Sequence, residues 1–217
     1  MEQRPMARAG TADRIIDGAE AIVEEHGVAT LTLEQAAKRA GVSKGGVLYH
    51  FPNKEALVAA MIARFTGRFD YAVEQLTAED PSARGRTTRS YVKASFGHAP
   101  GTGPNFDRAC GSITAALANN PGQLEVVRGQ SARWQRAVEA DGLDPVFASI
   151  IRLAVDGLWL GENFNLMRMN PKMRARIEAR LLAWTQLKEL PVKGAARAAA
   201  ARAPQPPKLK SKKGRAS

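Results

Sequence analysis

Cysteine, histidine and long apolar runs are scarce in this chain of 217 residues. Its one cysteine, Cys110, cannot form an internal disulfide, which fits a reducing compartment. The three histidines lie in different segments without a cysteine or carboxylate at metal-ligand spacing, so we expect neither a metal nor a cofactor. No stretch approaches the roughly 18 consecutive apolar residues of a membrane span, and the N-terminus does not resemble a secretory signal. We therefore expect a cytoplasmic protein without a membrane partner.

Motifs of catalysis are also missing from the sequence. Cys110 has no apparent base partner that would activate it as a nucleophile. The segment 97–105, GHAPGTGPN, lacks the adjacent lysine and hydroxyl residue of a phosphate-binding loop, and we interpret it as an ordinary loop. We therefore do not expect an enzyme.

Acidic residues are absent after Glu189, whereas eight lysines and arginines lie there. These eight account for most of the net charge of +11 and leave +3 for residues 1–192. We expect the segment 191–217, rich in Ala, Pro, Lys and Arg, to be a disordered basic tail that either attracts DNA non-specifically or only aids solubility. Residues 1–60 hold seven basic and eight acidic residues, so an argument for DNA binding must rest on local patterning.

The stretch from Thr32 to Lys54 predicts two short helices joined by a tight turn. Thr32 with Gln35 three residues later forms a capping-box pattern at the start of the first helix. Gly41 is suited to the left-handed conformation that ends this helix, and Ser43 can cap the second. Pro52 disfavours helical geometry at the residue before it, so the second helix should span only 44–50. This arrangement is typical of a helix-turn-helix, although a pair of short helices also occurs in ordinary helical packing.

Charge and composition favour DNA binding by this stretch. Residues 35–53 contain no acidic residue but include Lys38, Arg39 and Lys44, which a phosphate backbone attracts. The second helix contains Gly45 and Gly46, each of which costs roughly 1 kcal/mol relative to alanine. A close approach of the backbone to DNA would offset this cost.

From about Ala12 to Leu57 the sequence resembles the DNA-binding domain of the tetracycline-repressor (TetR) family of bacterial transcriptional regulators. The segments that carry the resemblance are EEHGVATLTLEQ, AAKRAGVSKGGVLYHF and PNKEAL. The resemblance implies an all-helical homodimer in which residues 44–50 enter the major groove of double-stranded DNA and Lys54 holds a phosphate. Many members have an aromatic residue where this chain has Leu48, so we expect DNA to be read differently there. The candidate DNA-binding residues are Thr32, Lys38, Ser43, Lys44, Gly45, Gly46, Leu48, Tyr49, His50 and Lys54.

The remaining helices are predicted from apolar spacing and cap residues. Asp144 before Pro145, and Asn170 before Pro171, are strong signals for two helix starts. Together with a first helix over 11–26, the sequence predicts about nine helices. Those after the helix-turn-helix are expected over 53 to about 77, 87–96, 106–119, 121–140, 145 to about 169, and 171 to about 189.

The last two helices carry broad apolar faces. In the family that the sequence resembles, two such helices from each subunit form a four-helix dimer interface. They could instead close the core of a single subunit. The candidate interface residues are Ile150, Leu153, Gly157, Gly161, Phe164, Ile177, Leu181 and Trp184.

Aromatic and soft side chains are frequent between residues 65 and 167. Such residues are more often core, but the resemblance implies that they enclose an effector pocket, which would favour an apolar or aromatic ligand. Glu162 and Asn163 are candidates for its polar end. The candidate pocket residues are Phe65, Phe69, Tyr91, Phe96, Phe106, Cys110, Trp134, Trp159 and Asn163.

We therefore predict a ligand-responsive homodimeric transcriptional repressor, cytoplasmic and on the nucleoid when bound to DNA. Its expected parts are a flexible arm (1–10), a helix-turn-helix head (11–57), a helical effector-binding and dimerisation body (58–190) and the tail (191–217). Two alternatives stay open: a DNA-binding regulator without an effector, and an all-helical enzyme or lipid-binding protein with an incidental helix-turn-helix.

Overall fold

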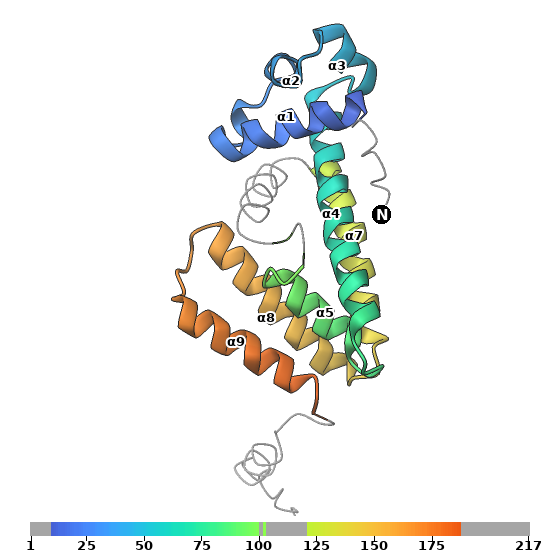
Figure 1. The fold of residues 1–217 in the computed structure, drawn as a ribbon, viewed down its shortest axis with the longest axis vertical. Helices are drawn as coiled ribbons and strands as arrows, with labels where there is room; N and C mark the ends of the chain where they lie inside the picture. The colour runs from blue at the N-terminus through green and yellow to red at the C-terminus, as the bar shows by residue number, and fades with distance from the viewer. Residues whose placement is uncertain (1–9, 100–101, 103–120, 188–217) are drawn as a thin grey trace, which may run out of the picture. The chain divides into compact units, whose positions relative to one another are not determined.

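A computed structural model of the protein describes residues 10–99, 102 and 121–187, and all regular structure in these ranges is helical (Figure 1). The first elements are α1 (Thr11–His26), the 3-10 turn η1 (Val28–Thr30), α2 (Leu33–Ala40) and α3 (Lys44–His50). They are followed by α4 (Lys54–Glu79), α5 (Arg86–Ser95), α7 (Pro121–Glu139), α8 (Pro145–Asn163) and α9 (Pro171–Trp184). The predicted all-α fold with an N-terminal helix-turn-helix head is confirmed. Across the described ranges, no helix is both long and apolar enough to cross a membrane.

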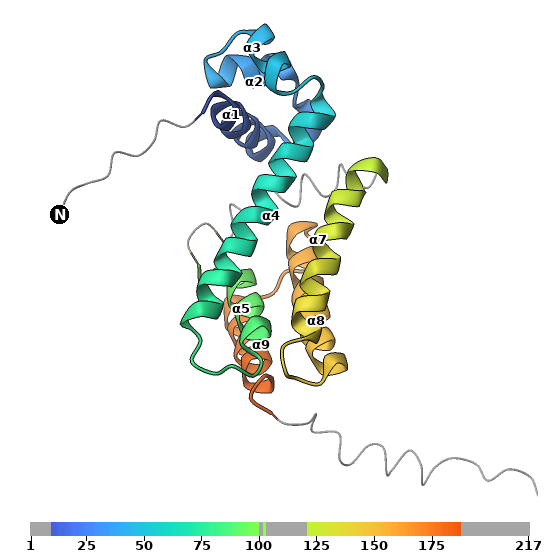
Figure 2. The ribbon, with the colours of Figure 1, turned by 90° about the vertical axis from the view of Figure 1, so that its right-hand side faces the viewer.

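The head, formed by α1 to α3, has its own apolar core. Ile15, Ala19 and Val23 recur on one face of α1 and are buried, as the helical spacing predicts. Val47 of α3 and Leu57 of α4 complete this core from the other side. The first turns of α4 thus belong structurally to the head, and α4 then continues into the body (Figures 1 and 2).

The head is fastened to α4 by an ion-pair cluster. The Arg64 guanidinium lies 2.6 Å from a carboxylate oxygen of Asp17 and 2.6 Å from one of Glu20, and both acids are on α1. Arg68 lies 3.4 Å from Glu20. Leu124 and Val127 at the start of α7 also pack against the head core. Two body helices, α4 and α7, therefore contact the head.

In the body, α5 packs against α4, α7, α8 and α9. Asp141 caps its N-terminus by accepting hydrogen bonds from the backbone N–H groups of Thr87 and Thr88, at 3.1 and 2.7 Å. Arg89 forms an ion pair of 2.8 Å with Asp80, and both side chains are only 5% exposed. Burial and paired hydrogen bonds therefore hold α5 in register with the loop after α4.

Several predicted helix ends differ from the observed ones. α8 ends at Asn163 instead of near Met169, because Asn165 adopts a positive φ of 53° and the Gly161 carbonyl accepts from the N–H groups of Leu166 and Met167. α9 ends at Trp184 instead of near Glu189, and α4 extends to Glu79. The predicted helix 106–119, the arm 1–9 and the tail from residue 188 lie outside the described residues.

Candidate functional site

The second helix of the helix-turn-helix, α3, is positioned by its caps and by one buried side chain. The Thr32 hydroxyl accepts a hydrogen bond from Gln35 N–H at 3.1 Å and starts α2, while Gly41 at φ 65° ends it. The Ser43 hydroxyl accepts from Gly46 N–H at 3.0 Å and starts α3. Val47, with 0% of its surface exposed, is the side chain that anchors α3 in the head core. The predicted helix-turn-helix geometry is confirmed.

The opposite face of α3 is exposed. Leu48 is 43% exposed and Tyr49 85% exposed, and Lys44, Gly45 and His50 are also on the surface. The Tyr49 and His50 rings contact each other edge-on at 5.1 Å. Gly46 is half-buried beneath the Ser43 hydroxyl. The structure therefore places most of the predicted DNA-binding residues of this helix on one accessible surface.

The basic side chains of the head differ in their exposure and in their contacts within the subunit. Lys38 and Lys44 are exposed. Arg39 instead forms an ion pair and hydrogen bonds with Glu25 of α1, which lower the pKa of that carboxyl, so Arg39 fastens α2 to α1. Lys54 is half-buried, and its Nζ donates to the Ala29 carbonyl at 3.2 Å, which holds the ammonium at the head end of α4.

Three of the predicted pocket residues form one cluster in the body. The rings of Phe69, Tyr91 and Trp134 meet edge-on, with centroids 5.0 to 5.8 Å apart. Trp134 Nε1 donates to Asp70 Oδ1 at 2.6 Å, and Gln130 Nε2 donates to the same oxygen at 2.7 Å. This cluster joins α7 to α4.

A buried polar network adjoins these rings. The Tyr91 hydroxyl donates to Asp156 Oδ1 at 2.6 Å, and Arg152 lies 3.3 Å from the other carboxylate oxygen. Arg152 also donates to Gln135 and Ser131 on α7. Burial raises the pKa of Asp156, and burial together with the nearby Asp156 charge raises the pKa of the Tyr91 hydroxyl.

Two other pocket candidates have contacts outside this cluster. Phe96 packs under the Arg174 guanidinium at 4.5 Å, on the α9 side of α5. Asn163 donates to the Trp159 carbonyl of its own helix at 2.8 Å. Phe65 lies one turn before Phe69 and is half-buried, as is Trp159. Phe106 and Cys110 lie outside the described residues.

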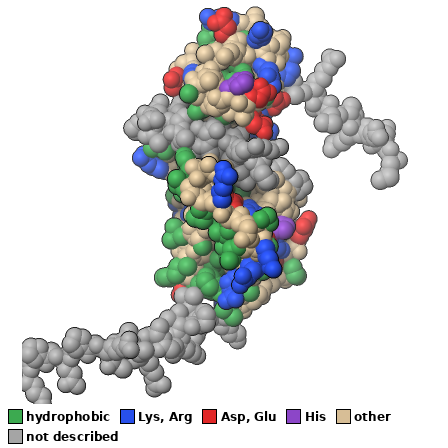
Figure 3. All heavy atoms as spheres, turned by 90° about the vertical axis from the view of Figure 1, so that its left-hand side faces the viewer, with side chains coloured by type: hydrophobic (Ala, Val, Ile, Leu, Met, Phe, Trp, Pro, Cys, Tyr) green, Lys and Arg blue, Asp and Glu red, His purple; other side chains and the backbone are tan. Residues whose placement is uncertain are grey.

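An apolar stripe runs along the exposed side of α8. Its large members are between 38% and 66% exposed, and Gly157 continues the stripe, with no described atom within 4 Å of the place a Cβ would occupy. Spacings of three and four residues keep them on one helical face. The α8 stripe consists of Val146, Ile150, Leu153, Gly157, Leu160 and Phe164. Figure 3 shows apolar side chains gathered with Lys and Arg over one face of the body.

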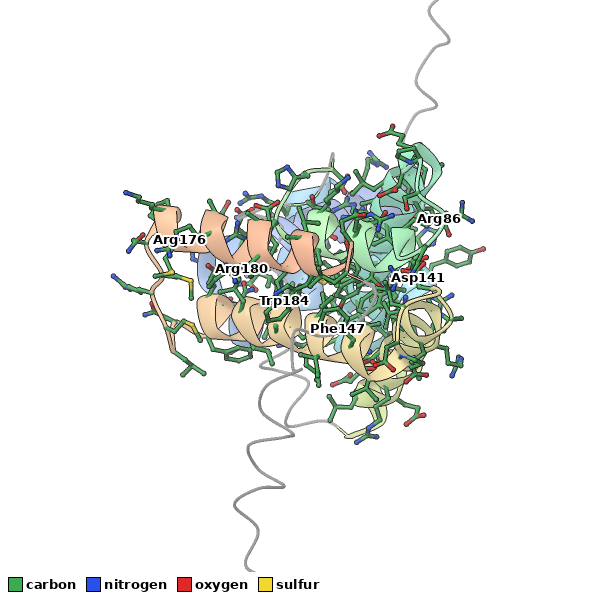
Figure 4. The ribbon with its side chains drawn as sticks, turned by 90° about the horizontal axis from the view of Figure 1, so that it is seen from below. Arg86, Asp141, Phe147, Arg176, Arg180 and Trp184 are labelled. Atoms are coloured by element: carbon green, nitrogen blue, oxygen red, sulfur yellow. The ribbon has the colours of Figure 1, made fainter. Side chains whose placement is uncertain are left out.

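Four of the predicted interface residues are not part of this exposed stripe. A Cβ at Gly161 would lie 2.9 Å from Met167 Cε, so this glycine accommodates a contact within the subunit. Leu181 is 4% exposed, and the Trp184 ring packs against Phe147 at 5.9 Å between α9 and α8 (Figure 4). Ile177 is half-buried. The partial burial of α9 explains the difference, because apolar spacing alone does not distinguish a core face from an interface face.

Sequence patterns did not identify Asp70, Arg152 and Asp156. Their one local signal is the i, i+4 pairing of Arg152 with Asp156 on an otherwise apolar helix, since charges in such a position need a partner. Asp70 gave no such signal, because its partners are 60 to 64 residues away. Within the ranges described, no group of three or more metal-ligating side chains is present.

Comparisons with known proteins agree with this architecture. The model of the tetR family of bacterial regulatory proteins matches residues 15–61, and that of the tetracyclin repressor-like C-terminal domain matches residues 85–186. The transcriptional regulator EthR of Mycolicibacterium smegmatis is 32% identical over 144 residues, which are 63% of this chain and 63% of EthR. The regulator TtgR of Pseudomonas putida is 36% identical over 70 residues, which are 32% of this chain and 33% of TtgR.

Solved structures share the fold over most of the chain. A transcriptional regulator from Rhodococcus sp. superposes with a TM-score of 0.66 at 18% identity, covering 82% of this chain and 95% of the regulator. The multidrug binding protein EbrR, complexed with malachite green, superposes with a TM-score of 0.57 at 24% identity over 80% of this chain and 96% of EbrR. The family models and the two curated relatives describe regulators, not enzymes. This chain belongs to the TetR family of bacterial transcriptional regulators.

Proposed function

We propose that the protein is a homodimeric repressor that binds a palindromic DNA operator and is released from it by a small apolar or aromatic effector. The observation that carries the proposal is the outer face of α3, where Lys44, Leu48 and Tyr49 are exposed on a helix of two turns. A short, protruding helix of this kind fits the major groove. Lys38 and Lys44 attract phosphate, and residues 35–53 contain no acid that would repel it.

The α8 stripe supports the dimeric part of the proposal. Its exposed side chains form a continuous apolar face on one subunit, and Gly157 would let a partner helix approach closely. A two-fold axis through such a face pairs each stripe with its copy. Two recognition helices then reach successive major grooves about one DNA turn apart, which requires an operator with approximate two-fold symmetry.

The contacts between body and head support control by an effector. A ligand inserted among Phe69, Tyr91 and Trp134 would displace the indole that is bonded to Asp70 on α4. Because Arg64 ties the same helix to α1, a shift of α4 moves the reading head. Effector and DNA would then oppose one another, each lowering the affinity for the other by the same factor.

An effector-independent regulator is the second candidate, and one observation favours it. The rings of Phe69, Tyr91 and Trp134 already contact each other, so this part of the body is occupied by the chain itself. A screen of apolar and aromatic compounds against the protein–operator complex separates the two candidates. Release of DNA by any compound that binds the body supports effector control, whereas ligand binding without release contradicts it.

DNA protection by the purified full chain tests the proposal, together with Lys54→Ala, Tyr49→Ala and the control Lys172→Ala, since Lys172 is exposed on α9. We expect a symmetric protected site and salt-dependent affinity. Lys54→Ala should weaken binding evenly across sequences, Tyr49→Ala should change sequence preference, and Lys172→Ala should change neither. A chain that protects no site at any salt concentration would contradict the proposal.

A further inference from the structure

The exposed face of α3 combines one large apolar side chain with a glycine. Leu48 is 43% exposed, although its neighbour Val47 shows that this helix can bury an apolar residue. Gly45 lies three residues before Leu48 and is also exposed, so the two positions are neighbours on the helix surface. The surface of α3 therefore has an apolar side chain next to a position where the backbone is not covered by a side chain.

No packing within the head requires glycine at position 45. Among the atoms that the structure describes, a Cβ built there would meet only the Ser43 hydroxyl, at 3.9 Å, which is an ordinary contact. By contrast, a Cβ at Gly18 on α1 would lie 3.2 Å from Arg39, so that glycine has a reason inside the subunit. A helical glycine costs about 1 kcal/mol relative to alanine. The most direct reason for glycine at position 45 is a surface outside the subunit that comes close to the helix.

Charge identifies that surface as DNA. Lys44 lies beside Gly45, and the stretch 35–53 has no acidic residue, so a polyanion is the complementary partner. The base edges in the major groove are almost entirely hydrogen-bonding groups, and the thymine 5-methyl group is the apolar exception. Leucine can make no hydrogen bond with its side chain, so it has only this group to recognise.

We propose that Leu48 is a specificity-determining residue that contacts the 5-methyl group of one thymine in each operator half-site, at a close approach that Gly45 permits. This inference rests on the proposed DNA-binding function. Burying one methyl group corresponds to about a fourfold gain in affinity for each half-site. For a dimer on a symmetric operator, the two contacts together correspond to roughly fifteenfold.

Deoxyuridine substitution tests the contact, because deoxyuridine differs from thymidine only by the missing 5-methyl group. Each symmetric pair of thymines in the protected site is replaced in turn, and affinity of the full chain is measured. We expect one pair to lower affinity roughly fifteenfold. Leu48→Ala should bind the thymine and deoxyuridine operators equally, while Leu48→Met, which keeps an apolar side chain, should still prefer thymine. Leu48 is exposed, and circular dichroism will verify that both variants fold.

Gly45→Ala tests the close approach separately. Alanine favours the helix and meets no described atom closer than 3.9 Å, so the variant should melt at the same or a higher temperature. Its operator affinity should nevertheless fall. The inference is overturned if the chain binds its operator specifically but no deoxyuridine pair lowers the affinity, or if Leu48→Ala still prefers thymine. Either result leaves the proposed function standing. A chain that protects no DNA site overturns the proposed function itself.

Discussion

Truncation of Leu153 should weaken the proposed dimer through the α8 stripe. This side chain is 66% exposed in the subunit and lies in the middle of the stripe. Burying a whole leucine side chain stabilises by about 1.5–3 kcal/mol, so burying two-thirds of it contributes about 1–2 kcal/mol. A two-fold interface contains two copies, and their loss costs about 2–4 kcal/mol, or about 30- to 1,000-fold in the dimer Kd.

The dimer Kd of Leu153→Ala can be measured by sedimentation equilibrium over a dilution series. Tyr71→Ala is the matched control, because Tyr71 is 62% exposed but lies on α4, away from the stripe. Gly157→Leu is a second probe, since no described atom lies within 4 Å of the Cβ position and the subunit can accommodate the added side chain. This variant should also dissociate. A Leu153→Ala dimer as tight as the wild type would refute the assignment of the stripe as the interface.

Four further outcomes are expected. Asp80→Asn should lower the free energy of unfolding by about 2–4 kcal/mol, because it leaves the buried Arg89 charge unpaired. Urea unfolding measures this free energy. The control is Glu125→Gln, which removes an exposed ion pair with Arg128 and should change the free energy of unfolding by less than about 0.5 kcal/mol. The Arg89 hydrogen bonds lower the pKa of Asp80 from 3.8 to about 2. The stabilisation by this ion pair is therefore complete above pH 4 and is lost as the pH falls toward 2. The free energy of unfolding should then fall more between pH 7 and pH 3 in the wild type than in Asp80→Asn. Lys54→Ala should reduce the slope of log operator affinity against log salt concentration by about one, because one phosphate contact is lost. Deleting residues 192–217, which hold eight basic and no acidic residues, should flatten the salt dependence of non-specific binding, and an unchanged slope would show that the tail has no such role.

The head could be predicted closely because its geometry depends on local signals. Thr32, Ser43 and Asn53 each cap the helix that follows, and Gly41 takes the left-handed conformation that the sequence indicated. Each of these features involves residues no more than four positions apart. Sequence patterns of this kind predict helix starts well, since a cap residue satisfies backbone groups that would otherwise lack a partner.

The body could be predicted less completely because its specific contacts are long-range. The family resemblance grouped Phe69, Tyr91 and Trp134 among the candidate pocket residues, yet it did not show that Asp70 and Asp156 join them. The end of α8 was also missed. It depends on a positive φ at Asn165, and no glycine marked that position.

In the proposed mechanism, α4 transmits any change between body and head because both are anchored on it. Arg64 fixes the upper part of α4 to α1, and Asp70, less than two turns later, fixes the next part to α7. Gly67 lies between these two anchors. A glycine within a helix lowers its local stability by about 1 kcal/mol relative to alanine, so α4 bends more easily there than at neighbouring positions. Since α7 also contacts the head core through Leu124, displacement of Trp134 reaches the head along two helices, and its effect on the recognition helices depends on both.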